Sequence, residues 1–306
     1  MGRYVITQPQ VFQNIQLYIH FFMPALETSL WGESAPLVSK EEFLQWIIFE
    51  DDDVLVLNKP GWLVCHPSKN GPWSSLVGAA KEYLGMESIH LASRLDRETS
   101  GCVLLAKHRK AARIWQKGTE DRLVSRSYLA ILRGCIKEKV SVSTYLGNDP
   151  TSAVFVKQRV TEESKKSKEA KTHFTPLTCQ NDHTLCLVFT ETGRKHQIRV
   201  HAQHIEHILV GEKLYGDDEN YYLEFCEGGW KDNWLPDLGM YRQALHGRSL
   251  CHHRENVTFR APLPDDFGNY LQNEIQMDSQ LVENCLAQAD RITEDRNRVV
   301  LEGGAS

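Results

Sequence analysis

Short apolar runs separated by polar turns organise most of the chain of 306 residues. The runs at 54–57 (VLVL) and 102–106 (CVLLA) have the length of buried strands. An acidic turn at 50–53 precedes the first run, and the turn sequence Asn-Lys-Pro-Gly at 58–61 follows it. Further strands are predicted at 126–134, 172–174 and 184–190.

Helical patterns are fewer and shorter than the strand patterns. A short amphipathic helix is predicted at 74–84, and 108–120 places Ala111, Ile114 and Trp115 at helical spacing with basic residues opposite. The polar, lysine-rich segment 147–171 is predicted to be a mobile loop that could also grip phosphates. A short helix and then disorder are expected after Met277. We therefore expect an N-terminal extension at 1–45, a catalytic domain at 46–275 and a C-terminal tail at 276–306.

The composition is that of an ordinary soluble globular protein, with 41% hydrophobic and 25% charged residues. It contains no run of 18 apolar residues, and its start lacks the pattern of a signal peptide, so we expect a cytoplasmic protein without a membrane span. Its eight cysteines include no CxxC pair. They are expected to be small buried hydrophobes in a reducing compartment rather than a disulfide framework.

The net charge of −5 does not by itself indicate nucleic-acid binding, but the charge is uneven. The segment 107–133 carries eight lysines and arginines against only Glu120 and Asp121. A local basic face on an acidic chain is compatible with RNA binding, because the local potential matters more than the sum.

The strongest candidate for chemistry is Asp96, within the segment 94–101 (RLDRETSG) that immediately precedes the run at 102–106. This position predicts that Asp96 lies on a loop at the mouth of a sheet. The flanking Arg94 and Arg97 would hold such a carboxylate ionised even if it were partly desolvated, as a nucleophile or general base requires. A solvated cluster of salt bridges is the alternative interpretation of these charges.

The segment 93–101 resembles the signature of the RluA family of pseudouridine synthases, His-Arg-Leu-Asp-Arg-(Asp or Glu)-Thr-Ser-Gly, with Ser93 in place of the histidine. We expect Ser93 to alter the substrate preference rather than abolish activity. The segment 192–201 (TGRKHQIRVH) fits a second family motif, and 208–217 fits a third, with Glu212 in place of the usual aspartate. Weaker matches at 48–67, 126–134, 242–250 and 261–267 extend the resemblance over residues 48–270. The family's auxiliary S4 domain has no counterpart in the pattern of residues 1–45.

The resemblance implies an α+β fold with a mostly antiparallel central sheet, and helices and loops around an active-site cleft. It also implies an isomerase that converts uridines of ribosomal or transfer RNA to pseudouridine, without a cofactor or metal, here expected to be a monomer. Asp96 would attack the nucleoside or abstract a sugar proton, Arg199 would pair with Asp96, and Tyr128 would stack on the base and help remove the C5 proton. The RNA-binding residues expected are Arg94, Arg97, Arg194, Lys195 and His196.

Two alternatives accompany this interpretation. His201, His204 and His207 could indicate a zinc hydrolase, although a spacing of three residues drifts around a helix and no glutamate lies between the first two. A catalytically inactive RNA-binding or ribosome-assembly protein could share the fold, but it need not retain Asp96, Tyr128 and Arg199 together. Lys59 and His66 could also face RNA.

Overall fold

The computed structural model describes residues 4–7, 37–66 and 71–303. Its strands are β1 (Tyr4–Thr7), β2 (Ile47–Glu50), β3 (Val54–Lys59), β4 (His90–Leu91), β5 (Ser100–Ala106), β6 (Val124–Arg133), β7 (Val140–Asn148), β8 (Gln158–Thr161), β9 (Lys168–Gln180), β10 (His183–Thr190), β11 (Leu245–His252) and β12 (Val257–Arg260). Its helices are α1 (Lys40–Gln45), α2 (Leu76–Leu84), α3 (Arg109–Glu120), α4 (Gln197–His204), α5 (Asn220–Gly228), α6 (Leu235–Leu238), α7 (Asp265–Asn273) and α8 (Ser279–Gly303), with 3-10 turns at Pro72–Ser74 and Asp232–Trp234.

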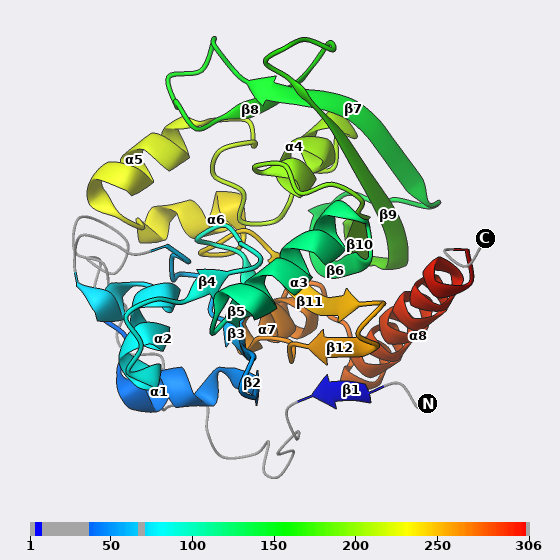
Figure 1. Cartoon of the computed structure of the whole chain (residues 1–306). Coiled ribbons are helices and arrows are strands. Elements are labelled where there is room, and N and C mark those ends of the chain that lie inside the picture. The colour runs from blue at the N-terminus through cyan, green and yellow to red at the C-terminus, as the bar shows by residue number, and fades with distance from the viewer. Residues whose placement is uncertain (1–3, 8–36, 67–70, 304–306) are drawn as a thin grey trace.

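All the described strands join one sheet (Figure 1). The main path runs β2-β3-β5-β11-β6-β10-β9-β7-β8, while β12 joins β11 to β1, and β4 pairs with β5. Only the pairs β5–β11 and β1–β12 are parallel among the pairings of the described strands. The predicted α+β class with a mostly antiparallel sheet is confirmed.

The N-terminal half of the sheet is covered on both faces, which explains its continuous apolar runs. Leu55, Leu57 and Val103 belong to one core cluster with residues of α1 and α2. Val56 and Leu104, which point the other way, pack with residues of α3, β11 and β12. Because side chains alternate between the two faces of a strand, β3 and β5 each contribute residues to two core clusters, one on either face of the sheet.

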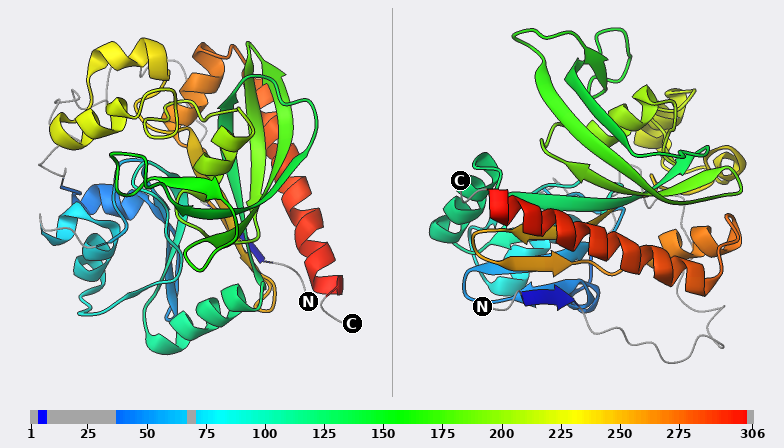
Figure 2. Two further views of the ribbon diagram at one scale, coloured as in Figure 1. Left: turned by 90° about the horizontal axis from the view of Figure 1, so that it is seen from above. Right: turned by 90° about the vertical axis from the view of Figure 1, so that its right-hand side faces the viewer.

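The C-terminal half repeats this arrangement around β6 and β10. Leu129 and Ile131 of β6 pack in one core cluster with residues of α7 and α8, whereas Ala130 and Leu132 pack in another with residues of α4. Figure 2 shows α8 as a long helix along the outside of the sheet. The prediction of a short helix followed by disorder is therefore wrong for this segment: α8 has 25 residues, and the core continues past residue 275.

Local side chains define where several helices begin. Ser39 and Glu42 form a capping box at α1, and Ser75 and His108 accept backbone N–H bonds at the starts of α2 and α3. The predicted helices at 74–84 and 108–120 thus start where a side chain satisfies orphan backbone donors. In the acidic turn before β3, Asp51 Oδ1 accepts the N–H groups of Asp53 and Val54.

Two expectations differ from the structure. The segment 147–171 contains β8, which pairs with β7, so it is not simply a loop. Cys135 and Cys179 form a disulfide across the ends of β6 and β9, with Cα atoms 5.5 Å apart, although 44 residues separate them in sequence. The six other cysteines are free, and all except Cys226 are buried, as expected of small hydrophobes.

The N-terminal extension is described only in part, and residues 8–36 lie outside the described part of the chain. Its strand β1 aligns Tyr4 with Val257 and Thr7 with Arg260 of β12, so it extends the sheet. None of the described helices has both the length and the apolar character of a membrane span.

Candidate active site

A cleft of about 1330 Å³ lies where the loop before β5, strand β6 and the start of α4 meet. It is larger than the roughly 300–1,000 Å³ typical of small-molecule pockets, so it has room for part of a polymer. The residues predicted from the sequence to form the site all line it: Arg94, Asp96, Arg97, Tyr128, Arg194, Lys195, His196 and Arg199.

The loop that carries Asp96 is fixed by the residues that follow it. Thr99 Oγ1 accepts Gln243 Nε2 at 2.6 Å, and Ser100 Oγ lies 3.0 Å from His246 Nδ1. Gly101 has φ of 115°, and a Cβ atom there would come within 2.3 Å of the carbonyl oxygen of Gly247. Glycine is required here because the backbone is left-handed and β11 approaches closely. Asp96 is therefore positioned at the edge of a rigid, parallel strand pair.

Arg199 connects Asp96 to a second carboxylate, that of Glu212. Arg199 Nε and Nη2 donate to the two oxygens of Glu212 at 2.8 and 2.6 Å, and Nη1 lies 3.3 Å from Asp96 Oδ2. Glu212 is held in turn by the backbone N–H groups of Leu214 and Tyr215. Such two-point contacts fix the plane of a guanidinium. The predicted pairing of Arg199 with Asp96 is present in the structure.

Asp96 is kept ionised by charges that come from other elements. Burial favours its neutral form, but His196 in its protonated form and the permanent charge of Arg199 outweigh burial and hold the pKa of the Asp96 carboxyl below its usual value. Because the pKa of His196 itself lies at about 4, Arg199 is the stronger partner at neutral pH. The carboxylate remains 31% exposed and faces the cleft.

The prediction that Arg94 and Arg97 hold Asp96 ionised is wrong, because their side chains contact other groups. Arg94 Nη1 lies 3.0 Å from His66 Nε2, so these two exposed residues form one pair at the rim of the cleft. Arg97 Nε donates to the carbonyl oxygen of Trp62 at 3.3 Å. Neighbours in sequence point in different directions on an irregular loop, which the sequence alone did not reveal.

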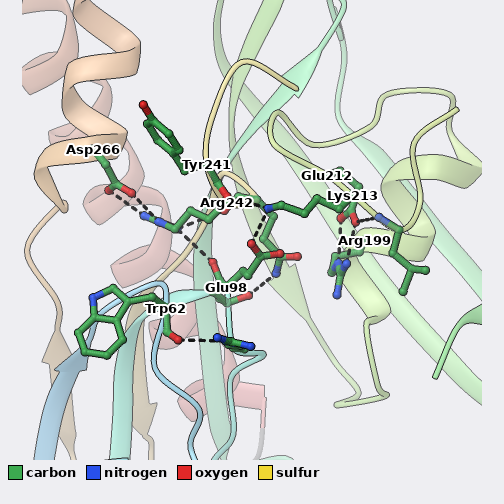
Figure 3. A network of polar contacts seen from close by, with 12 residues as sticks. Trp62, Glu98, Arg199, Glu212, Lys213, Tyr241, Arg242 and Asp266 are labelled. Atoms are coloured by element: carbon green, nitrogen blue, oxygen red, sulfur yellow. Dashed lines mark hydrogen bonds and ion pairs between the residues drawn. The ribbon is translucent and has the colours of Figure 1, made fainter. Parts of the chain in front are cut away.

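A buried network of charges supports the loop from behind (Figure 3). Lys213, which is fully buried, donates to Glu98 Oε1 at 2.5 Å and to the carbonyl oxygen of Tyr241 at 2.7 Å. Arg242 forms a two-point ion pair with Asp266 and also donates to the carbonyl oxygen of Glu98 at 3.3 Å. Both cations thus hold residue 98, two positions from Asp96.

Lys59 completes this support, and it does not face RNA. Its ammonium group is fully buried and donates to the carbonyl oxygens of Pro60, Leu63 and Arg97 at 2.8 to 2.9 Å. Burial lowers the pKa of Lys59 to about 8. The interpretation of Lys59 as an RNA contact is therefore wrong.

Tyr128 lies on β6 and lines the cleft with Asp96. Burial raises the pKa of the Tyr128 phenol, and the charge of Asp96 adds to this effect although Arg126 opposes it. The phenol is therefore protonated at neutral pH. Thr190, which also lines the cleft, opposes the rise in the pKa of the phenol.

The second motif contributes three further residues to the cleft, at the start of α4. Arg194 Nε donates to the carbonyl oxygen of Glu169 at 2.7 Å, and Lys195 is exposed. His196 adopts a left-handed backbone with φ of 54°, and its Nδ1 lies 2.7 Å from the hydroxyl of Tyr215. Residues at positive φ often mark functional sites, because other contacts must compensate the strain.

The histidines that suggested a zinc site do not converge. His201 is bonded through both ring nitrogens, to Thr172 at 2.8 Å and Thr144 at 2.9 Å. His207 Nδ1 lies 2.7 Å from the carbonyl oxygen of Arg133. Their ring atoms are used by neighbouring strands, so this arrangement does not present a set of ligands to one ion.

Comparison with known proteins identifies the class of protein that the sequence motifs resemble. A family model for RNA pseudouridylate synthases matches residues 53–204. The Bacillus subtilis protein YjbO, described as an uncharacterized RNA pseudouridine synthase, is 32% identical over 89% of each chain. The ribosomal large subunit pseudouridine synthase D of Neisseria meningitidis serogroup A is 34% identical over 77% of this chain and 63% of that relative. The structure of human RNA pseudouridylate synthase domain containing 4 shares the fold, with a TM-score of 0.59 and 24% identity over 76% of this chain and 94% of that one.

These findings define an isomerase that acts on RNA. The chain belongs to the RluA family of RNA pseudouridine synthases, as its motifs predicted.

Several residues of the site were missed by the sequence reasoning. Glu98 and Lys213 lie within family-like motifs, but nothing in their spacing shows that they meet 115 positions apart. Tyr215 was not singled out from the sequence, yet its hydroxyl contacts His196 and its ring lies 5.0 Å from the guanidinium of Arg199. The motif at 208–217 was the available signal, because it contains this tyrosine.

Proposed function

We propose that Asp96 is the catalytic carboxylate of a pseudouridine synthase acting on uridines of ribosomal or transfer RNA. The observation that carries this proposal is the pairing of Asp96 with Arg199 in a cleft that also holds Tyr128. An ionised carboxylate can attack the nucleoside or abstract a sugar proton, and its lowered pKa supports either role.

Tyr128 would stack on the uracil ring. Because its pKa is raised, the protonated phenol is better suited to stacking and hydrogen bonding than to strong base catalysis. Its oxygen would thus assist the removal of the C5 proton rather than carry it alone.

The RNA would enter with the target base out of its stack, at a cost of a few kcal/mol. Arg94, Lys195 and the partly exposed Arg194 lie at the cleft and would contact phosphates. Arg97 and His196 also line the cleft and would contact the target nucleotide itself.

Large-subunit ribosomal RNA is the first candidate substrate, because a relative at 34% identity carries that substrate in its name. The experiment is pseudouridine mapping of total RNA from cells that lack this gene, with and without the wild-type gene restored. A site that disappears and returns identifies the RNA. If no site changes in any RNA, a non-catalytic role on the same fold, such as ribosome assembly, replaces the proposal.

We further propose that the protein is a monomer located in the cytoplasm. Light scattering of the purified protein with and without RNA tests the monomer, and fractionation of cells tests the location. A dimer that persists at nanomolar concentration would contradict this expectation.

A further inference from the structure

Tyr215 connects the protein interior to His196 at the wall of the cleft. Tyr215 is fully buried, and its hydroxyl oxygen accepts the backbone N–H of Gln158 at 3.0 Å. The same oxygen lies 2.7 Å from His196 Nδ1. The ring of His196 is therefore held through Nδ1. Since His196 lines the cleft, Nε2 is the ring nitrogen available to a ligand there.

The direction of these two bonds determines where His196 carries its proton. A backbone N–H can only donate, so Gln158 occupies a lone pair of the Tyr215 oxygen and leaves the phenolic proton in need of an acceptor. Among the residues that the structure describes, His196 Nδ1 is the acceptor within reach. Nδ1 of a neutral ring then lacks a proton, and the proton resides on Nε2.

The surroundings keep this ring neutral. Burial and the positive charge of Arg199 lower the pKa of His196 to about 4, although the carboxylates of Asp96 and Glu212 oppose them. Lys195 also lowers it. Asp96 and His196 each influence the titration of the other, as expected of neighbours across one cleft. Because the His196 ring is neutral, Arg199 is the charged partner of Asp96. The neutral ring also keeps one N–H group that can donate a hydrogen bond near Asp96.

We infer that Tyr215 holds His196 as the Nε2–H tautomer, and that this neutral N–H donates to a carbonyl oxygen of the target uracil. The inference rests on the proposed function of the cleft. His196 is then a catalytic residue that contacts the reacting base, and Tyr215 is a positioning residue that acts through it.

The reaction has a clear use for such a donor. When the bond from N1 to the ribose breaks, its electron pair stays on the uracil, and the negative charge spreads over N1 and the carbonyl oxygens. The base then turns, the bond from C5 to the ribose forms, the C5 proton leaves, and N1 gains a proton, so atoms and charges balance. A neutral donor stabilises the detached anion without giving up its own proton. This holds whether Asp96 attacks the nucleoside or abstracts a sugar proton.

The tautomer can be measured without any assay of activity. The full chain is labelled with ¹⁵N-histidine, His196 is assigned by the loss of its signals in His196→Gln, and the ring nitrogens are recorded at neutral pH by long-range ¹H–¹⁵N correlation. We expect an unprotonated Nδ1 and a protonated Nε2 in the wild type, and a mixture of tautomers in Tyr215→Phe, which keeps the ring but lacks the hydroxyl. A protonated Nδ1 in the wild type would overturn the inference, even if Tyr215→Phe does not fold.

A matched pair of variants tests the role of the donor. The amide of His196→Gln reaches the place of Nε2, whereas the amide of His196→Asn reaches only that of Nδ1 and tolerates the left-handed backbone better. Single-turnover rates are measured by release of tritium from uridine C5 in the unmodified RNA that mapping identifies. We expect His196→Asn to be slower than the wild type by about 100-fold and His196→Gln by less than about 10-fold, with RNA affinities unchanged.

Equal rates for the two variants, or a loss confined to RNA affinity, would overturn the catalytic role of His196. Failure of the proposed function is recognised separately. In that case the wild type itself forms no pseudouridine in any RNA, while the tautomer measurement still gives its answer.

Discussion

Glu212 holds Arg199 by two hydrogen bonds of 2.8 and 2.6 Å, and the third nitrogen of the guanidinium, Nη1, lies 3.3 Å from Asp96. One carboxylate thus orients the arginine from the interior, and the other faces the cleft. Glu212 and Arg199 are both buried, with side chains 1% and 5% exposed. The orientation of the Asp96 partner therefore depends on a residue that lies behind it.

Replacing Glu212 by Gln should destabilise the protein by about 3–5 kcal/mol, because the charge of Arg199 loses its buried partner. Glu212→Asp keeps the charge and should retain most of the stability. Free energies of unfolding in urea check both. The matched control is Glu224→Gln, which removes the exposed partner of Lys231 and should change stability by less than about 1 kcal/mol. Equal losses in Glu212→Gln and Glu224→Gln would contradict the role of the buried pair.

Glu98 and Lys213 should be strongly coupled. Lys213 is fully buried and lies 4.7 Å from the ring centre of Phe225, so Glu98→Gln leaves an unpaired cation in an apolar site. The double variant Glu98→Gln/Lys213→Met should be more stable than the sum of the single losses by roughly 1–3 kcal/mol. A double-mutant cycle in urea measures this coupling. Additive losses would show that the two charges do not support each other.

The stability of the protein should fall in acid partly because His246 is buried in its neutral form. Burial, with the charges of Arg248 and Arg242, lowers the pKa of His246 to about 3, whereas in the unfolded chain it is about 6.5. Between these values the unfolded state binds one more proton, so stability is lost as the pH falls from about 6.5, by about 1.4 kcal/mol per pH unit.

The variant His246→Gln tests this directly, because glutamine does not titrate. The free energy of unfolding of both proteins is measured in urea between pH 7.5 and pH 4.5. The difference in the free energy of unfolding between the wild type and His246→Gln should narrow by about 1.4 kcal/mol for each pH unit below about 6.5. A difference that stays constant across this range would show that His246 is not held neutral.

Lys195 should contact an RNA phosphate, because it is exposed at the rim of the cleft. Lys195→Ala should weaken RNA binding for all sequences alike and reduce the slope of log affinity against log salt by about one. Lys110→Ala removes an exposed lysine of α3 that does not line the cleft and should leave the slope unchanged. Binding titrations over a range of salt concentrations compare the two. If Lys110→Ala changed the salt slope and Lys195→Ala did not, the RNA would contact α3 rather than this rim of the cleft.

Local patterns predicted the elements of this fold better than its long-range contacts. The apolar runs at 54–57 and 102–106 became β3 and β5, because strands buried on both faces need continuous hydrophobicity. The length of α8 was missed, because its apolar positions are widely spaced and its stability comes from packing on the sheet. The disulfide between Cys135 and Cys179 was missed for a similar reason, since only the strand order brings its ends together.

In the candidate site, too, the sequence predicted some features and missed others. The motifs predicted which residues meet in the cleft, including the pair Asp96 and Arg199. They did not predict side-chain direction: Arg97 lies beside Asp96 in sequence but contacts Trp62, while Lys59 is buried beneath the loop. Spacing fixes neighbours on a helix or strand, but on an irregular loop the direction follows from contacts far away in the sequence.

The central claim, that Asp96 carries the chemistry, is tested most directly with the purified protein and Asp96→Asn. Asparagine keeps the size of the side chain and removes its charge, so the fold and the affinity for RNA should be retained. Pseudouridine formation is measured on the unmodified RNA identified by mapping, together with RNA affinity and the free energy of unfolding. We predict that wild-type protein converts the target uridine, and that Asp96→Asn binds the same RNA without measurable conversion. Conversion by Asp96→Asn at a rate close to that of the wild type would contradict the account.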